Sequence, residues 1–431
     1  MEFSDGLGEN DGTPDQPRAQ PLGDSRSRIA SLDVTRGVAV LGILIANIIA
    51  FGQPFDAYSY PGAFLAPVGP VDHWLWAAQL VLVDGKFRGV FTLLFGAGIY
   101  LFMERAWARG EGFERQIRRL AWLGVFGLAH FILLWRGDIL FSYAVAGFGA
   151  LFFLDLSPGR QVLLGVLAYV AGAVLSFTST VPMEQAADGH FAAQTEMAAT
   201  QSKLLEAEAD DLSDGSDEAA ILTRGDYPTF IAHTVAHHLP SLPFQTLYFA
   251  FETLPLMLIG TGLYRLGLFS GGFAAREQLL WGGAAAALSV ATTIPIALWA
   301  LGKGLSFYAT IAAFDGWSAI PRLAGSLGYL ALLALYGRCA HGWIAHRFAL
   351  AGRTAFSNYL GTSAAMMLVF PGWGFGLFGE LTRLQLYGVV LVAWVVMLAW
   401  PGPWLARFRY GPLEWLWRCL TYGRMVPMRR R

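Results

Sequence analysis

Long apolar stretches separated by short polar ones dominate the chain from residue 29 onward. A helix needs about 20 mostly apolar residues to cross a bilayer, and ten stretches approach that length. They fall in two groups of five, within 29–181 and 244–405. The ten predicted membrane helices are residues 35–51, 87–103, 120–135, 138–156, 161–181, 244–265, 279–301, 320–336, 348–370 and 384–405. The pattern predicts an all-α membrane bundle.

Three parts of the chain fall outside this pattern. Residues 1–28 are polar and lack the apolar core of a signal peptide, which predicts a disordered cytoplasmic tail. Residues 182–243 form the one long polar insert, with a helix-forming composition at 191–209 and an acidic, turn-like stretch at 210–217. Residues 406–431 predict an amphipathic aromatic helix on the inner leaflet, followed by a basic tail.

The segment 71–83 is apolar and aromatic but too short to span a bilayer. It could extend the second membrane helix or re-enter the membrane. We expect a helix in the outer interface.

Composition supports the membrane assignment. Hydrophobic residues make up 55% of the chain and charged residues 14%, against roughly 25% charged in soluble proteins. Lipids are therefore the expected partners, and nucleic acid is not. The net charge of -1 is uninformative about nucleic acid, and the positions of the charges carry the information. The two cysteines form neither a disulfide framework nor a metal motif.

The basic residues predict the topology. With ten helices and the N-terminus inside, 22 of the 30 basic residues fall on the inner side, as the positive-inside rule requires. Both ends are then cytoplasmic. The other eight are Lys86, Arg88, Arg136, Lys203, Arg224, Lys303, Arg322 and Arg383.

The most promising polar pair is His130 and Asp138. His130 is the one histidine inside a predicted membrane helix, and Asp138 follows a tight turn, with Tyr143 a further turn along. A carboxylate can orient an imidazole as a general base. This catalytic interpretation requires a shared, water-filled chamber. The alternative is a histidine satisfied by a carbonyl and an aspartate that caps a helix.

The start of the first membrane helix carries a second group. Asp33 and Arg36 are three residues apart and can pair on one helical face. Arg36 could bind a cofactor phosphate at the cytoplasmic mouth, or only stabilise the helix start. Asn47 lies eleven residues later on nearly the same face, where it is either an interhelical tie or a substrate contact.

Three further charges are expected at membrane depth. Lys86 and Arg88 could line a polar cavity, with Glu252 as the answering acid, or they could extend toward the outer surface. Charges within the bilayer need partners, a cavity or a function.

The C-terminal half also places basic residues at the inner side of the membrane. Arg353 and Asn358 begin the ninth membrane helix and are candidates for cofactor binding. Glu414 and Arg418 have i, i+4 spacing and are expected to pair in the inner amphipathic helix.

Histidines near the end of the polar insert raise the question of a metal site. His233 and His237 have the i, i+4 spacing of zinc ligands, but no third ligand is evident. No metal is therefore expected.

Five motifs resemble the YeiB-like family of bacterial inner-membrane proteins, a family of unknown function. They are SLDVTRGVAVLGILIANIIAFG from Ser31, KFRGVFTLLFGAG from Lys86, GLAHFILLWRGDILFSYAVAG from Gly127, GRTAFSNYL from Gly352 and GPLEWLWRCLTYG from Gly411. The resemblance implies a multi-pass protein of the bacterial cytoplasmic membrane.

The start of helix one also resembles, more distantly, transmembrane acyltransferases of the heparan glucosaminide acetyltransferase type. Those proteins use a histidine to move an acyl group from cytoplasmic acyl-CoA to an acceptor on the far side. The O-acylating branch has its histidine at the position of Asn47 in this chain. The heparan-modifying branch has its histidine about three helical turns further on, where this chain has Tyr58. The base cannot be carried over by position, although His130 could replace it.

Three functions follow from these observations. The first is an acyltransferase in which Arg36 and Arg353 bind acyl-CoA, such as acetyl-CoA, and a glycan, lipid or small molecule accepts the acyl group. The second is a small-molecule transporter that uses the same cavity. The third is a non-catalytic lipid-binding or scaffold protein. A homodimer is compatible with each.

Overall fold

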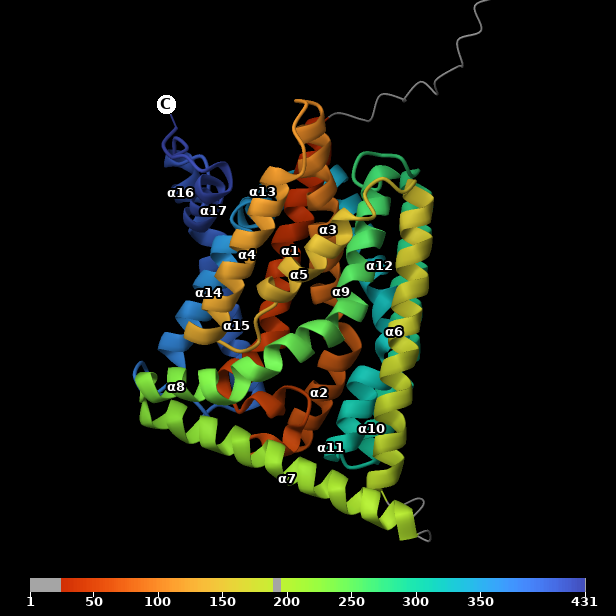
Figure 1. The fold of residues 1–431 in the computed structure, drawn as a ribbon, viewed down its shortest axis with the longest axis vertical. Helices are drawn as coiled ribbons and strands as arrows, with labels where there is room; N and C mark the ends of the chain where they lie inside the picture. Colours follow the sequence, from red (N-terminus) through yellow and green to blue (C-terminus); the bar gives the residue numbers. More distant parts are fainter. Residues whose placement is uncertain (1–24, 189–194, 431) are drawn as a thin grey trace, which may run out of the picture.

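A computed structural model describes residues 25–188 and 195–430. The predicted tail at 1–28 lies outside this part up to residue 24, and helix α1 begins at Ser25. The described chain is a helical bundle in which the C-terminus and the start of α1 lie at the same end (Figure 1). We call this the C-terminal end. Helix α7 crosses the opposite end, which we call the α7 end.

Helices account for all ten predicted membrane segments. The first five lie in α1 (Ser25–Gly52), α3 (Lys86–Trp107), α4 (Glu114–Leu133), α5 (Leu140–Leu151) and α6 (Pro158–Ala187). The other five lie in α9 (Leu242–Arg265), α10 (Ala275–Gly302), α12 (Ala319–Cys339), the pair α13 (Trp343–Arg353) and α14 (Ala355–Val369), and the pair α15 (Arg383–Ala399) and α16 (Pro401–Arg407).

Shorter elements connect or cover these helices. They are η1 (Phe55–Tyr58), η2 (Pro61–Ala63), α2 (Pro70–Leu82), α7 (Thr195–Arg224), α8 (Tyr227–His233), the π-helix η3 (Thr234–His238), η4 (Leu239–Ser241), α11 (Phe307–Ile311), the π-helix η5 (Ala312–Trp317) and α17 (Pro412–Tyr422).

Six helical segments of the described chain are long and apolar enough to cross a bilayer. They are Ala30–Gly52, Pro158–Ala187, Tyr227–Arg265, Ala275–Gly302, Ala319–Cys339 and Arg383–Arg407. The remaining predicted spans differ from that ideal for local reasons. Helix α5 is short, and the ninth span is broken at Thr354 between α13 and α14. The count of ten and the orientation stay predictions.

Lipid is the natural environment of the bundle's outer faces. Only 17% of the most apolar part of α6 is buried, and 22% of the corresponding parts of α10 and of Arg383–Arg407. Large apolar side chains such as Leu167, Leu288 and Val395 are exposed there. Continuous apolar surface of this kind marks contact with a membrane. The chain is therefore a membrane protein.

Glycines allow the inner helices to pack closely. A Cβ atom at Gly352 would lie 1.8 Å from the carbonyl oxygen of Asp33, where α13 crosses α1. A Cβ at Gly260 would lie 1.9 Å from the carbonyl oxygen of Leu93, where α9 crosses α3. Only glycine fits at such crossings, and small residues are typical of membrane helix interfaces.

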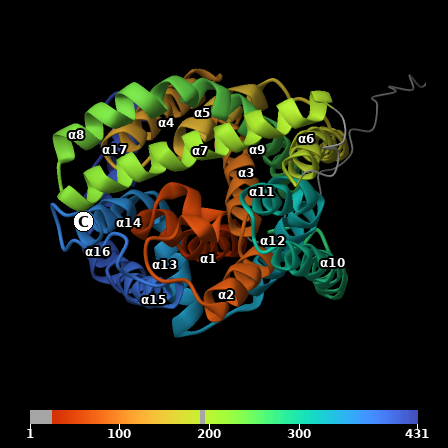
Figure 2. The same ribbon diagram turned by 90° about the horizontal axis from the view of Figure 1, so that it is seen from below.

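The α7 end carries a helical cap. Helix α7 lies beside the segment formed by α8 and η3, over α4 and α5 (Figure 2). Residues 210–217, which we expected to be turn-like, are helical within α7. Contacts of the Asp214 and Glu218 carboxylates with the bundle stabilise this helix and override the low helix propensity of its acidic residues. The segment 71–83 forms α2, which ends before α3 begins and is therefore no extension of it.

Candidate functional site

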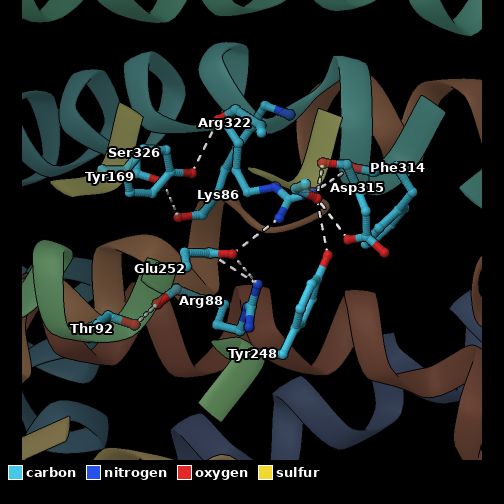
Figure 3. A network of polar contacts seen from close by, with 12 residues as sticks. Lys86, Arg88, Thr92, Tyr169, Tyr248, Glu252, Phe314, Asp315, Arg322 and Ser326 are labelled. Carbon is cyan, nitrogen blue, oxygen red and sulfur yellow. Dashed lines mark hydrogen bonds and ion pairs between the residues drawn. The ribbon is translucent and has the colours of Figure 1, made fainter. Parts of the chain in front are cut away.

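A partly buried ion-pair network joins α3, α9 and α12. Arg88 donates to both carboxylate oxygens of Glu252, at 2.9 and 2.8 Å, and Arg322 lies 3.2 Å from the same carboxylate. Figure 3 shows both guanidinium groups pointing at Glu252. The predicted partnership of Arg88 and Glu252 is therefore present. Both contacts come from one nitrogen, Arg88 Nη2, and they are charge-assisted hydrogen bonds, which are stronger than neutral ones.

Arg322 was not recognised from the sequence, which assigned it to the outer loops. Its guanidinium lies 4.0 Å from Asp315 and also contacts the Phe314 carbonyl. Arg322 follows a π-helix, η5, whose widened turn places Asp315 beside it. No periodicity in the sequence indicates that turn.

Lys86 does not extend to the outer surface. It is 1% exposed, and its Nζ donates to the Leu80 carbonyl at 2.9 Å. Tyr143 is equally buried, with its hydroxyl against Thr92 and 3.3 Å from the Arg88 carbonyl. The two side chains therefore belong to the packed interior around the network.

His130 and Asp138 form the expected pair. His130 Nδ1 lies 2.9 Å from Asp138 Oδ1, and Asp138 Oδ2 accepts the Phe141 N–H at 2.7 Å. The carboxylate thus caps α5 and holds the imidazole at once. A proton on Nδ1 leaves Nε2 as the basic atom, and Nε2 has no hydrogen-bond partner among the described residues.

The shared wet chamber that we expected around this pair is absent from the described structure. Neither side chain is exposed to solvent. The ring of Tyr359 packs against His130 with 5.3 Å between ring centroids. The sequence analysis did not identify Tyr359 as a neighbour of His130, and its ring occupies space beside the imidazole.

Tyr359 also lines a cavity of about 180 Å³, whereas His130 does not line it. Three arginines from different helices line it: Arg36, Arg119 and Arg353. Six aromatic residues contribute to the rest of its wall: Phe91, Phe95, Tyr143, Phe356, Tyr359 and Trp417. Glu414 and Trp417 of α17 and Arg119, in the second turn of α4, line this arginine cavity, so it lies toward the C-terminal end.

The three arginines have few acidic partners. Arg36 pairs with Asp33 at 3.1 Å, as the sequence predicts. Arg119 packs over Trp417, 4.5 Å from the ring centroid, and donates to Gln116 at 3.4 Å. Arg353 is exposed. The cavity therefore carries an excess of positive charge beside aromatic surface.

Glu414 also lines the cavity, but its predicted pairing with Arg418 is wrong. Glu414 Oε1 accepts the Ser357 N–H at 3.0 Å, and the Ser357 hydroxyl donates to Oε2. Removal of the carboxyl from water raises the pKa of Glu414, while these hydrogen bonds lower it less. Arg418 instead packs over Tyr410, at 4.5 Å.

The two predicted asparagines lie elsewhere. Asn47 lines a separate small cavity that it shares with Tyr359 and Ser363. The Asn358 side chain accepts the Trp400 indole N–H at 2.7 Å and donates to the Met397 carbonyl at 3.4 Å. Asn358 thus ties α14 to α15 and α16, and it is not part of the arginine cavity.

These features define an α-helical membrane protein with paired charges in its interior and a cationic cavity toward one end. Comparison with known proteins gives the family. The chain is 32% identical over 403 residues to the uncharacterized protein YeiB of Escherichia coli (strain K12). The aligned region covers 91% of this chain and 96% of YeiB. The chain belongs to the YeiB family.

Two other relatives cover the chain equally well. The uncharacterized protein YxaH of Bacillus subtilis (strain 168) is 26% identical, over 94% of this chain and 97% of that protein. An uncharacterized 39.9 kDa protein of Bacillus acidopullulyticus is 28% identical, over 93% and 96%. Residues 263–424 match the family model described as a protein of unknown function, DUF418.

Proposed function

We propose that this protein binds an amphipathic anion of the acyl-CoA class in the arginine cavity and acts as a membrane acyltransferase. The observation that carries the proposal is the convergence of Arg36, Arg119 and Arg353 on one aromatic-lined cavity. Guanidinium groups bind phosphates through paired N–H donors, and aromatic walls suit an acyl chain or a planar base.

The C-terminal end is the side from which this ligand would enter. It carries the basic residues that the positive-inside rule assigns to the cytoplasm. In a bacterial cytoplasmic membrane, acyl-CoA would then reach the cavity directly. Membrane lipids would surround α6, α10 and α15.

His130 is the proposed general base. Its Nε2 is the basic atom, because Nδ1 faces Asp138. The acceptor hydroxyl or amine would give its proton to Nε2 as it attacks the thioester carbon. The C–S bond would then break, and the imidazolium would return the proton to the departing CoA thiolate. Tyr359 separates His130 from the cavity, so the side chain of Tyr359 must rotate before transfer.

Ligand-induced stabilisation tests the binding step. The full chain, purified in detergent, is heated with millimolar acetyl-CoA, longer acyl-CoAs or free CoA. A ligand at about 100 times its Kd adds about 2.7 kcal/mol of stability, so a rise in Tm is expected. Unchanged melting with every acyl-CoA would reject the proposal and favour a lipid-binding or scaffold role.

Transport is a second candidate, favoured by a smaller cavity of about 20 Å³ toward the α7 end, lined by Phe51, Trp135 and Glu218. On α4, Leu123 lines the arginine cavity and Leu134 lines the smaller one, roughly 16 Å apart along the helix. His130 lies between them, as a gate residue would. Proteoliposomes loaded with labelled acyl-CoA separate the two activities, because transport moves the ligand intact whereas transfer yields an acylated acceptor.

A further inference from the structure

The π-helix η3 brings two histidines together at the α7 end. In a π-helix the hydrogen bonds join residues five apart, and the Leu239 N–H donates to the Thr234 carbonyl in this way. His233 and His238 are also five apart, and their ring centroids lie 5.2 Å from each other. The π-helix therefore brings His233 close to His238, in addition to the i, i+4 neighbour His237 that the sequence indicates.

Helix α7 adds a carboxylate to the two imidazoles. Asp214 Oδ1 lies 3.5 Å from His233 Nε2, and Asp214 Oδ2 lies 3.9 Å from His238 Nδ1. One ligand atom from each of the three residues lies within 4.8 Å of the others. The third ligand that the sequence did not reveal thus comes from α7, the helix that precedes α8 in the chain.

The histidines have unused hydrogen-bonding capacity. Among the described residues, His233 Nε2 and His238 Nε2 are buried without a hydrogen-bond partner. A buried polar atom left unpaired costs about 1–3 kcal/mol. His233 Nε2 lies beside the Asp214 carboxylate, and its lack of a hydrogen-bond partner is explained if a ligand completes the group.

The surrounding charge favours a cation. Arg136 lies 3.2 Å from His238 Nδ1, but it also pairs with Glu218 at 2.9 Å. A metal on Nδ1 would replace the contact from Arg136 and leave Arg136 with Glu218. Asp56 and Asp211 lie close enough to affect each other's ionisation, and Asp214 and Arg136 also act on Asp56. Around Asp214, carboxylates therefore outnumber the one guanidinium, that of Arg136.

We propose that Asp214, His233 and His238 bind a divalent transition-metal ion of the Zn²⁺ class. Two imidazoles and one carboxylate form a ligand set that suits zinc, whereas Mg²⁺ and Ca²⁺ prefer oxygen ligands. Water would complete the coordination. The ion would join α7 to η3 and so fasten the cap over the α7 end of the bundle.

Metal content and melting temperature test this site without any assay of activity. The full chain, purified without a polyhistidine tag and stripped with EDTA, is incubated with Zn²⁺ or Mg²⁺, freed of unbound ion by gel filtration, and analysed by mass spectrometry for metals. We expect about one Zn²⁺ per chain and a higher Tm, with neither effect from Mg²⁺.

Two variants each remove one ligand, and one matched variant removes a charge from the same helix. Asp214→Asn and His233→Gln should lower zinc affinity at least tenfold, whereas Asp210→Asn, at an exposed position one turn before Asp214, should bind like the wild type. The Tm measured without metal shows whether each variant folds. One folded ligand variant, either Asp214→Asn or His233→Gln, is enough to test the site. Equal zinc content in wild type and a ligand variant, or an equal response to Mg²⁺, would overturn the site.

Discussion

The ring of Tyr359 lies 5.3 Å from the imidazole of His130, measured between centroids, and Tyr359 also lines the arginine cavity, whereas His130 does not. If Tyr359 is the barrier, Tyr359→Ala should open the cavity to His130. We expect diethyl pyrocarbonate, which modifies unprotonated histidines, to label His130 several-fold faster in that variant.

Tyr359→Phe is the matched control because it keeps the ring and removes only the hydroxyl that accepts the Ile139 N–H at 3.4 Å. Labelling is located by peptide mass spectrometry, with exposed His341 as an internal reference. If His130 stays protected in Tyr359→Ala while the protein remains folded, another group closes the cavity.

Glu252 neutralises the buried Arg322 and the partly buried Arg88, and this predicts an asymmetric mutational result. Glu252→Gln leaves Arg88 and Arg322 without their shared carboxylate. Removal of one partner from a fully buried pair costs about 3–5 kcal/mol, so a fall in Tm that corresponds to a smaller loss is expected for this partly buried pair. Glu206→Gln, at an exposed position on α7, should change the Tm little.

A double variant tests whether the charge causes the loss. Combining Glu252→Gln with Arg88→Met removes one of the stranded cations and should restore part of the stability. If the double variant melts no higher than Glu252→Gln alone, the effect comes from packing and not from uncompensated charge.

The hydropathy pattern was sufficient to predict the fold class, because lipid imposes long apolar helices whatever their partners. The break at Thr354 was missed, since the residues on both sides of it are apolar and helix-forming. The acidic stretch 210–217 was misjudged because its stabilising partners, Arg136 and His233, lie elsewhere in the chain.

The candidate site was predictable where both partners lie close in sequence or carry a charge at membrane depth. The pair of His130 and Asp138 meets the first condition, and the pair of Arg88 and Glu252 meets the second. Arg119 was missed, because one arginine among several near a helix start gives no sign that it faces a cavity.

Arg353 provides the most direct test of the anion site. The side chain is exposed, so Arg353→Gln should fold normally while it removes one phosphate-binding group. A hydrogen bond to a charged group contributes about 1.5–3 kcal/mol, which is roughly a tenfold or greater weakening of the Kd for acyl-CoA. The Kd is measured by calorimetry in detergent at two salt concentrations.

Arg347→Gln is the control, because Arg347 is on the same helix but packs over Trp343 and does not line the cavity. It should leave the Kd unchanged. Equal weakening by both substitutions would show that net charge at this end matters and that a specific contact does not. Added salt should weaken binding to the wild type more than to Arg353→Gln.

Gly260 tests the close helix crossing that positions Glu252 on α9. A methyl group there would collide with the Leu93 carbonyl, so Gly260→Ala must push α9 away from α3. Overpacking typically costs about 1–3 kcal/mol, and a lower Tm is expected. Gly283→Ala introduces the same methyl group into open space and should be neutral or slightly stabilising. Equal Tm values for both variants would mean that the two helices do not cross so closely.

Glu414 predicts how pH acts on the C-terminal end. Its pKa is raised in the folded protein, so the protonated carboxyl favours the fold. That stabilisation is complete below the ordinary pKa of glutamate, about 4.3, and is lost as pH rises through the raised value. Glu414→Gln stays neutral and keeps an oxygen for the Ser357 N–H. The Tm of Glu414→Gln minus that of the wild type should therefore increase between about pH 4 and pH 7, whereas Glu206→Gln should show no such trend. A difference that stays constant or falls over this range would mean that α17 binds the ionised carboxylate.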